Sequence, residues 1–194
     1  MRHFSKEFDT NHGPRTDVPS ILELIQELAD YEKESSSVEA TVESLSRTIA
    51  FAPSPIISAG STTPSTGDAI SSARPARCLL LFPDAKASNS NKPVAMALYF
   101  YNYSTWRAKP GIYLEDLYVR EGERGKGYGG TLLRELATEV IKMDGGRLEW
   151  SVLKWNEPSI KFYEGIGAKA MTEWQTMRVD GDALKELAEK VPKV

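Results

Sequence analysis

The sequence predicts an α/β fold with a mixed, largely antiparallel sheet flanked by helices. Two segments carry apolar residues at helical spacing, and several short β-prone segments lie between and after them. Helical and extended segments do not alternate regularly, which argues against a doubly wound parallel sheet. A chain of 194 residues is long enough to bury one core. We therefore expect a leader over 1–19, which could hold a first strand, and a single domain over 20–194.

The N-terminal part of this domain is predicted to contain two helices. Ser20 and Glu23 match a capping box, and apolar residues recur at helical spacing over 20–33. A weaker helical pattern covers roughly 38–51. Residues 53–75 are rich in Ser, Thr, Pro, Gly and Ala, which indicates a flexible surface insertion within the domain.

The remaining elements are mostly short. Stretches typical of strands cover 78–82, 93–103, 112–120, 147–153 and 173–179. The first two are expected to pair as an antiparallel hairpin. Further helices are predicted over 129–143, 157–166 and 182–190. Gly145 suits the end of the first of these helices, and Asn156 can cap the second, which has Pro158 in its first turn.

Composition argues against several classes of function. A net charge of −3 gives no help in binding nucleic acid, and no apolar run approaches the roughly 20 residues of a membrane span. The polar N-terminus lacks the apolar stretch of a signal peptide, so we expect a cytoplasmic protein. The single cysteine, Cys78, adjoins leucines and is predicted to be a core residue. Because His3 and His12 both lie in the leader, we expect neither a histidine-based triad nor a metal site.

A glycine-rich run joins a predicted strand to the 129–143 helix, and it reads Arg124-Gly125-Lys126-Gly127-Tyr128-Gly129-Gly130. Small residues let the backbone approach an anion closely, and the start of a helix attracts negative charge. Arg124 and Lys126 add charge-assisted hydrogen-bond donors. The run therefore predicts a cradle for the pyrophosphate of coenzyme A.

Other interpretations of this run fit less well. A dinucleotide-binding turn needs an acidic residue at the end of the next strand, whereas Glu149 lies inside its strand. Only 64 residues follow Gly130, too few for the rest of such a domain. An NTPase phosphate loop needs Lys-Ser or Lys-Thr after its last glycine, and here Thr131 follows directly. A mere tight turn needs one or two glycines rather than four.

Further segments connect the run to a known family. The pattern Arg/Gln-x-x-Gly-x-Gly/Ala, matched over 124–129, resembles the pyrophosphate motif of the GNAT superfamily of acetyltransferases. The segments 24–32, 113–119 and 155–163 resemble its diamine and polyamine branch. That branch contains spermidine/spermine acetyltransferase and relatives that act on thialysine. The resemblance spans roughly 20–190, apart from the insertion.

This resemblance implies a GNAT-type fold, acetyl-CoA as the cofactor, and a homodimer. It implies that an amine attacks acetyl-CoA directly within a ternary complex. The strand over 117–119 would pair with the pantetheine arm, and its N–H groups would polarise the thioester oxygen. The residues expected to bind the cofactor are Leu117, Tyr118, Val119, Arg124, Gly125, Lys126, Gly127, Tyr128, Gly129, Gly130, Asn156, Ser159 and Phe162.

Two residues are expected to move protons. Glu115 would take a proton from the amine through a water molecule, because a carboxylate pKa lies roughly six units below that of the amine. Tyr163 would protonate the departing thiolate, since phenol and thiol have similar pKa values. Judged from the residues alone, Glu115 could be an ordinary solvated carboxylate and Tyr163 an ordinary core aromatic. The resemblance favours the catalytic roles.

The amine is expected to contact Asp116, Tyr31, Glu32 and Trp106, because carboxylates and aromatic faces attract cations. Side chains alternate along a strand, so Glu115 and Asp116 can share one site only if the strand contains a bulge.

The segment 104–106 reads Ser-Thr-Trp, where polyamine acetyltransferases carry an acidic residue before the tryptophan. In this respect it is similar to the thialysine-type relatives. The expected substrate is therefore a small diamine or a lysine-like amino acid: thialysine, lysine, ornithine or a short polyamine. Two alternatives stay open, a protein or aminoglycoside acetyltransferase and a non-catalytic regulator that binds acyl-CoA.

Overall fold

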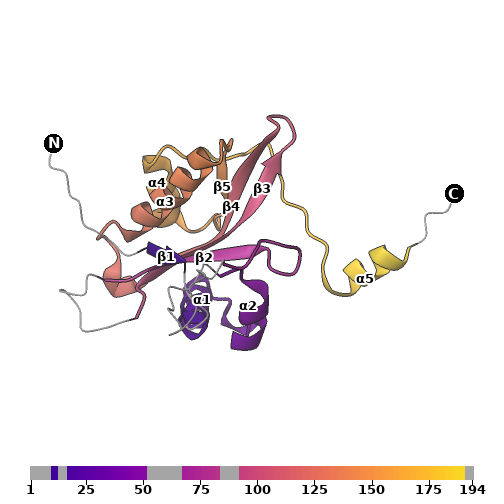
Figure 1. Cartoon of the computed structure of the whole chain (residues 1–194), viewed down its shortest axis with the longest axis horizontal. Coiled ribbons are helices and arrows are strands. Elements are labelled where there is room, and N and C mark those ends of the chain that lie inside the picture. The colour runs from indigo at the N-terminus through magenta and orange to yellow at the C-terminus, as the bar shows by residue number, and fades with distance from the viewer. Residues whose placement is uncertain (1–9, 13–16, 52–66, 84–91, 191–194) are drawn as a thin grey trace, which may run out of the picture. The chain divides into compact units, whose positions relative to one another are not determined.

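The computed structural model describes residues 10–12, 17–51, 67–83 and 92–190. The chain divides into two compact units, Met1–Ser151 and Val152–Val194. The first unit holds a five-stranded sheet of β1 (Thr10–His12), β2 (Ala76–Leu81), β3 (Ala95–Ser104), β4 (Lys109–Val119) and β5 (Leu148–Trp150). These strands are neighbours in that order. Every adjacent pair is antiparallel except β4 and β5, which are parallel (Figure 1). The predicted α/β class with a mixed, largely antiparallel sheet is confirmed.

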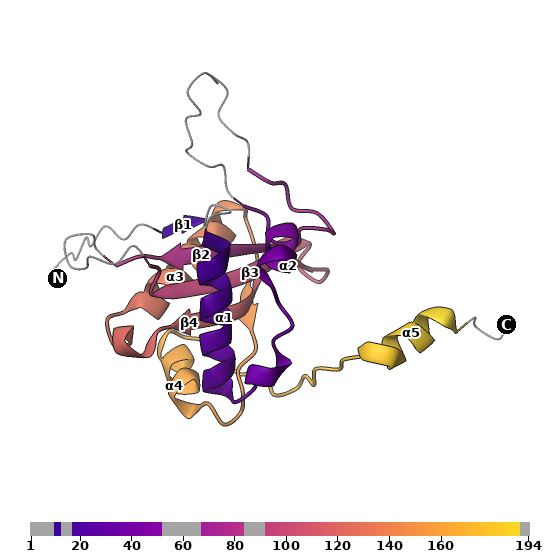
Figure 2. The ribbon, with the colours of Figure 1, turned by 90° about the horizontal axis from the view of Figure 1, so that it is seen from below.

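Helices cover both faces of this sheet. α1 (Val18–Glu32) and α2 (Val42–Thr48) lie on one face, and α3 (Tyr128–Lys142) lies on the other (Figures 1 and 2). Two short 3₁₀ turns, η2 (Ser35–Ser37) and η3 (Glu121–Glu123), follow α1 and β4. The second unit contains α4 (Glu157–Gly165) and α5 (Gly181–Glu189).

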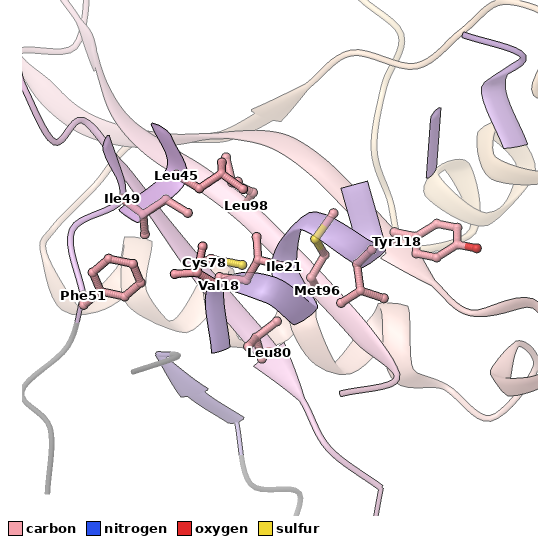
Figure 3. Packing of buried hydrophobic residues seen from close by; sticks show 11 residues of the cluster. Val18, Ile21, Leu45, Ile49, Phe51, Cys78, Leu80, Met96, Leu98 and Tyr118 are labelled. Atoms are coloured by element: carbon pink, nitrogen blue, oxygen red, sulfur yellow. The ribbon is translucent and has the colours of Figure 1, made fainter. Parts of the chain in front are cut away.

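The sheet is buried on both faces because its strands carry apolar residues at successive positions rather than at alternate ones. The cluster beneath α1 and α2 contains Val18, Ile21, Leu24, Leu45, Ile49, Phe51, Cys78, Leu80, Met96, Leu98 and Tyr118 (Figure 3). Cys78 is thus the core residue that its neighbours predicted. On the other face, Glu139 of α3 accepts hydrogen bonds from the hydroxyls of Tyr99, at 2.8 Å, and Tyr101.

The helix boundaries differ from those predicted. The capping box at Ser20 and Glu23 is wrong, because α1 already begins at Val18 and Ser20 lies inside it. A capping box forms instead at Thr41 and Ser44, at the start of α2. That helix covers less than the predicted 38–51, since its β-branched C-cap, Ile49, is extended and pairs with Ala76.

The strands also differ in part. A first strand exists at Thr10–His12, and the 147–153 strand is reduced to Leu148–Trp150. The strand predicted over 173–179 is wrong, because no described strand pairs with it and alternation alone does not make a strand. Of the 53–75 insertion, 53–66 lies outside the described residues.

Gly145 follows α3 as predicted, but the left-handed residue there is Asp144, with φ 52°. Gly145 is needed for space: a Cβ would lie 2.8 Å from the carbonyl oxygen of Val140 and 3.0 Å from that of Pro110. Because both neighbours are backbone atoms, Gly145→Ala is expected to lower the free energy of unfolding by about 1–3 kcal/mol. Urea unfolding measures this change. Gly122→Ala, where a Cβ meets no described atom within 4 Å, is the control and should cost under about 0.5 kcal/mol.

Candidate active site

A β-bulge lies in β4 at Glu115. The register pairs Tyr99 with Leu114 and Leu98 with Asp116, so Glu115 is an extra residue in β4. An extra residue moves every later side chain to the other face of the sheet. Sequence reasoning made such a bulge the condition for Glu115 and Asp116 to share one site, and the structure contains it.

The bulge turns the end of β4 toward α1. Before it, Leu114 stands opposite Tyr99, whose hydroxyl reaches Glu139 on α3. After it, Tyr118 belongs to the cluster beneath α1. Asp116 lies two residues before Tyr118 and therefore shares its face of the sheet. Without the bulge, both side chains would point toward α3.

The charges of neighbouring carboxylates act on Asp116. Burial, together with the charges of Glu115 and Glu32, raises the pKa of Asp116 to about 6. Burial and then the charge of Glu34 raise the pKa of Glu32. The side chain of Glu115 is exposed. Like charges that are partly buried disfavour the ionised state, and a bound cation relieves that cost. The arrangement can therefore attract an ammonium group.

Beyond the bulge, β4 is no longer paired with β5. The parallel register covers only Ile112–Leu114 of β4, so β5 leaves the edge of 115–119 uncovered. An extended ligand can add to such an edge through strand-like hydrogen bonds. The three expected pantetheine contacts, Leu117, Tyr118 and Val119, lie on this segment.

The glycine-rich loop links β4 to α3 through η3. Gly125 and Gly127 have φ of 77° and 86°, a left-handed conformation that favours glycine. A Cβ at Gly125, Gly127 or Gly130 would meet no described atom within 4 Å, so this side of the loop is open. The first-turn amides of Gly129 and Gly130 point out of α3, where the helix dipole attracts anions. The loop therefore fits a pyrophosphate group.

Arg124 does not extend along the loop but reaches back to α1. Its Nε donates to the carbonyl oxygen of Val119 at 3.1 Å. Its guanidinium carbon lies 4.7 Å from the centre of the Tyr31 ring and 5.9 Å from that of Tyr118. Arg124 thus connects the cofactor loop to a residue that was expected to bind the amine.

A pocket of about 280 Å³ lies at this contact, lined by Glu27, Asp30, Tyr31, Tyr118, Glu121 and Arg124. Burial and then the charge of Glu27 raise the pKa of Tyr118. Sequence reasoning missed the three carboxylates of this pocket. The spacing of Glu27, Asp30 and Tyr31 by three and four residues, which places them on one helix face, could have indicated the first two.

Lys126, Tyr128 and Trp106 do not line this pocket. Lys126 forms an ion pair with Glu123 at 2.7 Å, and Tyr128 is buried as the first residue of α3. Trp106 is 89% exposed in the turn between β3 and β4. Asp116 lies seven positions after Lys109, roughly 20 Å along β4. Within one chain, the structure does not bring Trp106 to the carboxylates.

The second unit carries the remaining expected residues on or beside α4. Asn156 caps this helix as predicted, and its Oδ1 accepts a hydrogen bond from the backbone N–H of Ser159 at 3.3 Å. The rings of Phe162 and Tyr163 are in contact, with their centres 5.3 Å apart. Tyr163, the expected proton donor, and Phe162, an expected cofactor contact, are therefore neighbours on α4.

The described residues contain neither a metal-binding group nor a membrane-spanning helix. No group of three or more His, Cys, Asp or Glu residues with the geometry for a metal ion occurs among them. Within the same ranges, every helix is too short or too polar to cross a membrane.

The sequence of this chain matches a known protein family and several of its members. The model of the acetyltransferase (GNAT) family matches residues 56–168. A thialysine N-epsilon-acetyltransferase from Bos taurus is 32% identical over 90% of this chain and 93% of its own length. An L-ornithine N5-acetyltransferase from Arabidopsis thaliana is 44% identical, over 46% of this chain and 40% of its own length. The chain thus spans less than half of the ornithine enzyme.

Solved structures share the fold. An integron cassette protein from V. cholerae has a TM-score of 0.68 at 21% identity, covering 96% of this chain and all of its own. A ribosomal-protein-alanine N-acetyltransferase from Brucella melitensis has a TM-score of 0.57 at 16% identity, covering 90% of this chain and 99% of its own. The family match and the full-length relative agree with the fold. The chain therefore belongs to the GNAT family and is an N-acetyltransferase.

Proposed function

We propose that this enzyme transfers the acetyl group of acetyl-CoA to a primary amine of a small diamine or lysine-like amino acid, such as thialysine, lysine, ornithine or a short polyamine. The observation that carries the proposal is the bulge at Glu115, which sets Asp116 on the side of the sheet that faces α1 and Glu32. The carboxylates of Glu115 and Asp116 lie in β4, just before the cofactor loop. The names of the thialysine and ornithine relatives support the same class of amine.

GNAT acetyltransferases use acetyl-CoA, and the first unit has features that suit it. The uncovered edge of β4 would hold the pantetheine arm, with Leu117, Tyr118 and Val119 in contact. The glycine loop and the first turn of α3 would hold the pyrophosphate. The other proposed cofactor contacts, Asn156, Ser159 and Phe162, belong to the second unit.

An ammonium group loses two protons in this reaction, one before attack and one to water as the amide forms, and the departing thiolate gains one. The amine nitrogen bonds to the acetyl carbon, the carbon–sulfur bond breaks, and both reactants are held in one ternary complex. Glu115, whose exposed side chain is open to water, takes the amine proton through a water molecule. Tyr163 gives its phenolic proton to the thiolate. Asp116 and Glu32 hold the cationic amine beside Glu115, and Trp106 is the proposed aromatic contact.

The proposal extends to a homodimer in the cytoplasm with one catalytic domain over 20–194. Trp106 supports the dimer indirectly. A side chain so exposed and so far along β4 from Asp116 would reach an amine site more readily in a second copy.

Thiol release from acetyl-CoA tests the proposed function. The purified enzyme is offered ornithine, lysine, thialysine, spermine, an aminoglycoside and a lysine-containing peptide. We expect release with the small amino acids and short diamines. Release only with the peptide or the aminoglycoside would contradict the proposed substrate class. Tight binding of coenzyme A without release for any amine would indicate a regulator.

A further inference from the structure

Tyr31 stands on α1 between the proposed amine site and the cofactor loop. Next to Glu32, it was expected to contact the amine, yet its ring lies 4.7 Å from the guanidinium of Arg124. We propose that Tyr31 is a positioning residue for the cofactor, whose ring orients Arg124 toward the diphosphate of acetyl-CoA. This inference rests on the proposed pyrophosphate site, of which Arg124 is an expected cofactor-binding residue.

Three contacts define the orientation of Arg124. Its Nε is bound to the carbonyl of Val119, its face lies on Tyr31, and Tyr118 stands 5.9 Å away. Arg124 is exposed as a whole, so its guanidinium is accessible to a ligand beside the loop. A planar guanidinium binds a phosphate through two parallel hydrogen bonds. Fixing its plane in advance reduces the entropy lost when the anion binds.

The supports of this contact are themselves held in place. Arg120, at the end of β4, forms ion pairs with Glu27 at 2.9 Å and with Glu23 at 3.2 Å, both on α1. The ring of Tyr118 packs in the core cluster while its hydroxyl points out of it (Figure 3), and the charge of Glu27 acts on that hydroxyl. These contacts tie α1 to the strand that leads into the loop. Tyr31 is therefore carried by a rigid element, as a positioning residue requires.

An amine contact and a positioning role for Tyr31 predict different losses. If Tyr31 touches the amine, its removal raises the KM for the amine with every acetyl donor. If it acts through Arg124 on the diphosphate, its removal weakens only donors that carry that group. S-acetylpantetheine lacks the diphosphate but keeps the thioester, so it separates the two roles.

The test compares Tyr31→Leu with Tyr31→Phe, which keeps the aromatic face. We expect Tyr31→Leu to raise the Kd of coenzyme A, measured by calorimetry, about three- to fivefold, and Tyr31→Phe to stay within about twofold. The ratio of kcat/KM for acetyl-CoA to kcat/KM for S-acetylpantetheine should fall about three- to fivefold in Tyr31→Leu and stay within about twofold in Tyr31→Phe. In an Arg124→Ala background, Tyr31→Leu should have no further effect on the Kd. Tyr103→Leu, at an exposed tyrosine near the end of β3, is the matched control.

Three results would overturn the inference. The first is an equal drop in kcat/KM with acetyl-CoA and with S-acetylpantetheine. The second is an equal rise in the Kd of coenzyme A in Tyr31→Leu and Tyr31→Phe. The third is a raised amine KM with an unchanged Kd for coenzyme A. Thermal unfolding of each variant identifies any general loss of stability. Because calorimetry needs no amine, it decides the role of Tyr31 even if the proposed amine transfer fails.

Discussion

Tyr163→Phe is expected to lower turnover at least about tenfold while leaving the affinity for coenzyme A within about twofold. The substitution removes only the hydroxyl, so the ring contact with Phe162 can be kept. The departing thiolate then loses its proposed proton donor and must take its proton from water. Steady-state kinetics with acetyl-CoA and ornithine, together with calorimetry of coenzyme A, measure the two quantities.

The control for Tyr163→Phe removes a hydroxyl elsewhere. Tyr103→Phe changes an exposed tyrosine near the end of β3, and it should leave turnover unchanged. Unchanged turnover in Tyr163→Phe would remove Tyr163 from the mechanism. A parallel loss of turnover and of coenzyme A affinity would instead indicate a packing role.

Asp116→Asn is expected to make the protein more stable and a poorer enzyme. The pKa of Asp116 is raised to about 6 in the folded state, against about 3.9 for an unfolded aspartate. The folded protein therefore holds this proton more tightly. Stability is undiminished below pH 4, falls as the pH rises from about 4 to 6, and stays lower above that. An asparagine cannot ionise and avoids this loss.

Thermal unfolding checks the sign of this effect. At pH 8 we expect the free energy of unfolding of Asp116→Asn to exceed that of the natural chain by about 1–3 kcal/mol. At pH 4 we expect this difference to vanish. Glu115→Gln, at an exposed carboxylate, should change stability by less than about 0.5 kcal/mol.

Kinetics at pH 8 check the cost to function. Asp116→Asn should raise the KM for the amine about tenfold or more, because a charge-assisted contact is lost. A variant that is destabilised at pH 8 and keeps its amine KM would show that Asp116 is a structural residue.

Local patterns in the sequence predicted much of the fold. The glycine run and its positive φ angles, the cap at Asn156 and the apolar stripe of α3 all depend on near neighbours. The strand predicted over 173–179 is wrong because alternating side chains only favour an extended conformation, whereas a strand also needs a neighbouring strand to pair with.

The candidate site was less accessible to sequence reasoning. Glu115 and Asp116 could be named, but the bulge that turns Asp116 toward α1 depends on how β3 and β4 align. The contact of Arg124 with Tyr31 depends on how α1 packs against the end of β4. For the same reason, Trp106 looked like a partner of Asp116 although the β3–β4 hairpin carries it away.

The most direct test of the proposed function compares kcat/KM among amines at saturating acetyl-CoA, with the acetylated product identified by mass spectrometry. The carboxylates around the bulge suit one ammonium group close to the reacting amine. We therefore expect ornithine or thialysine to exceed spermine at least about tenfold. A kcat/KM that is highest for spermine, or for an aminoglycoside, would contradict the proposed substrate class.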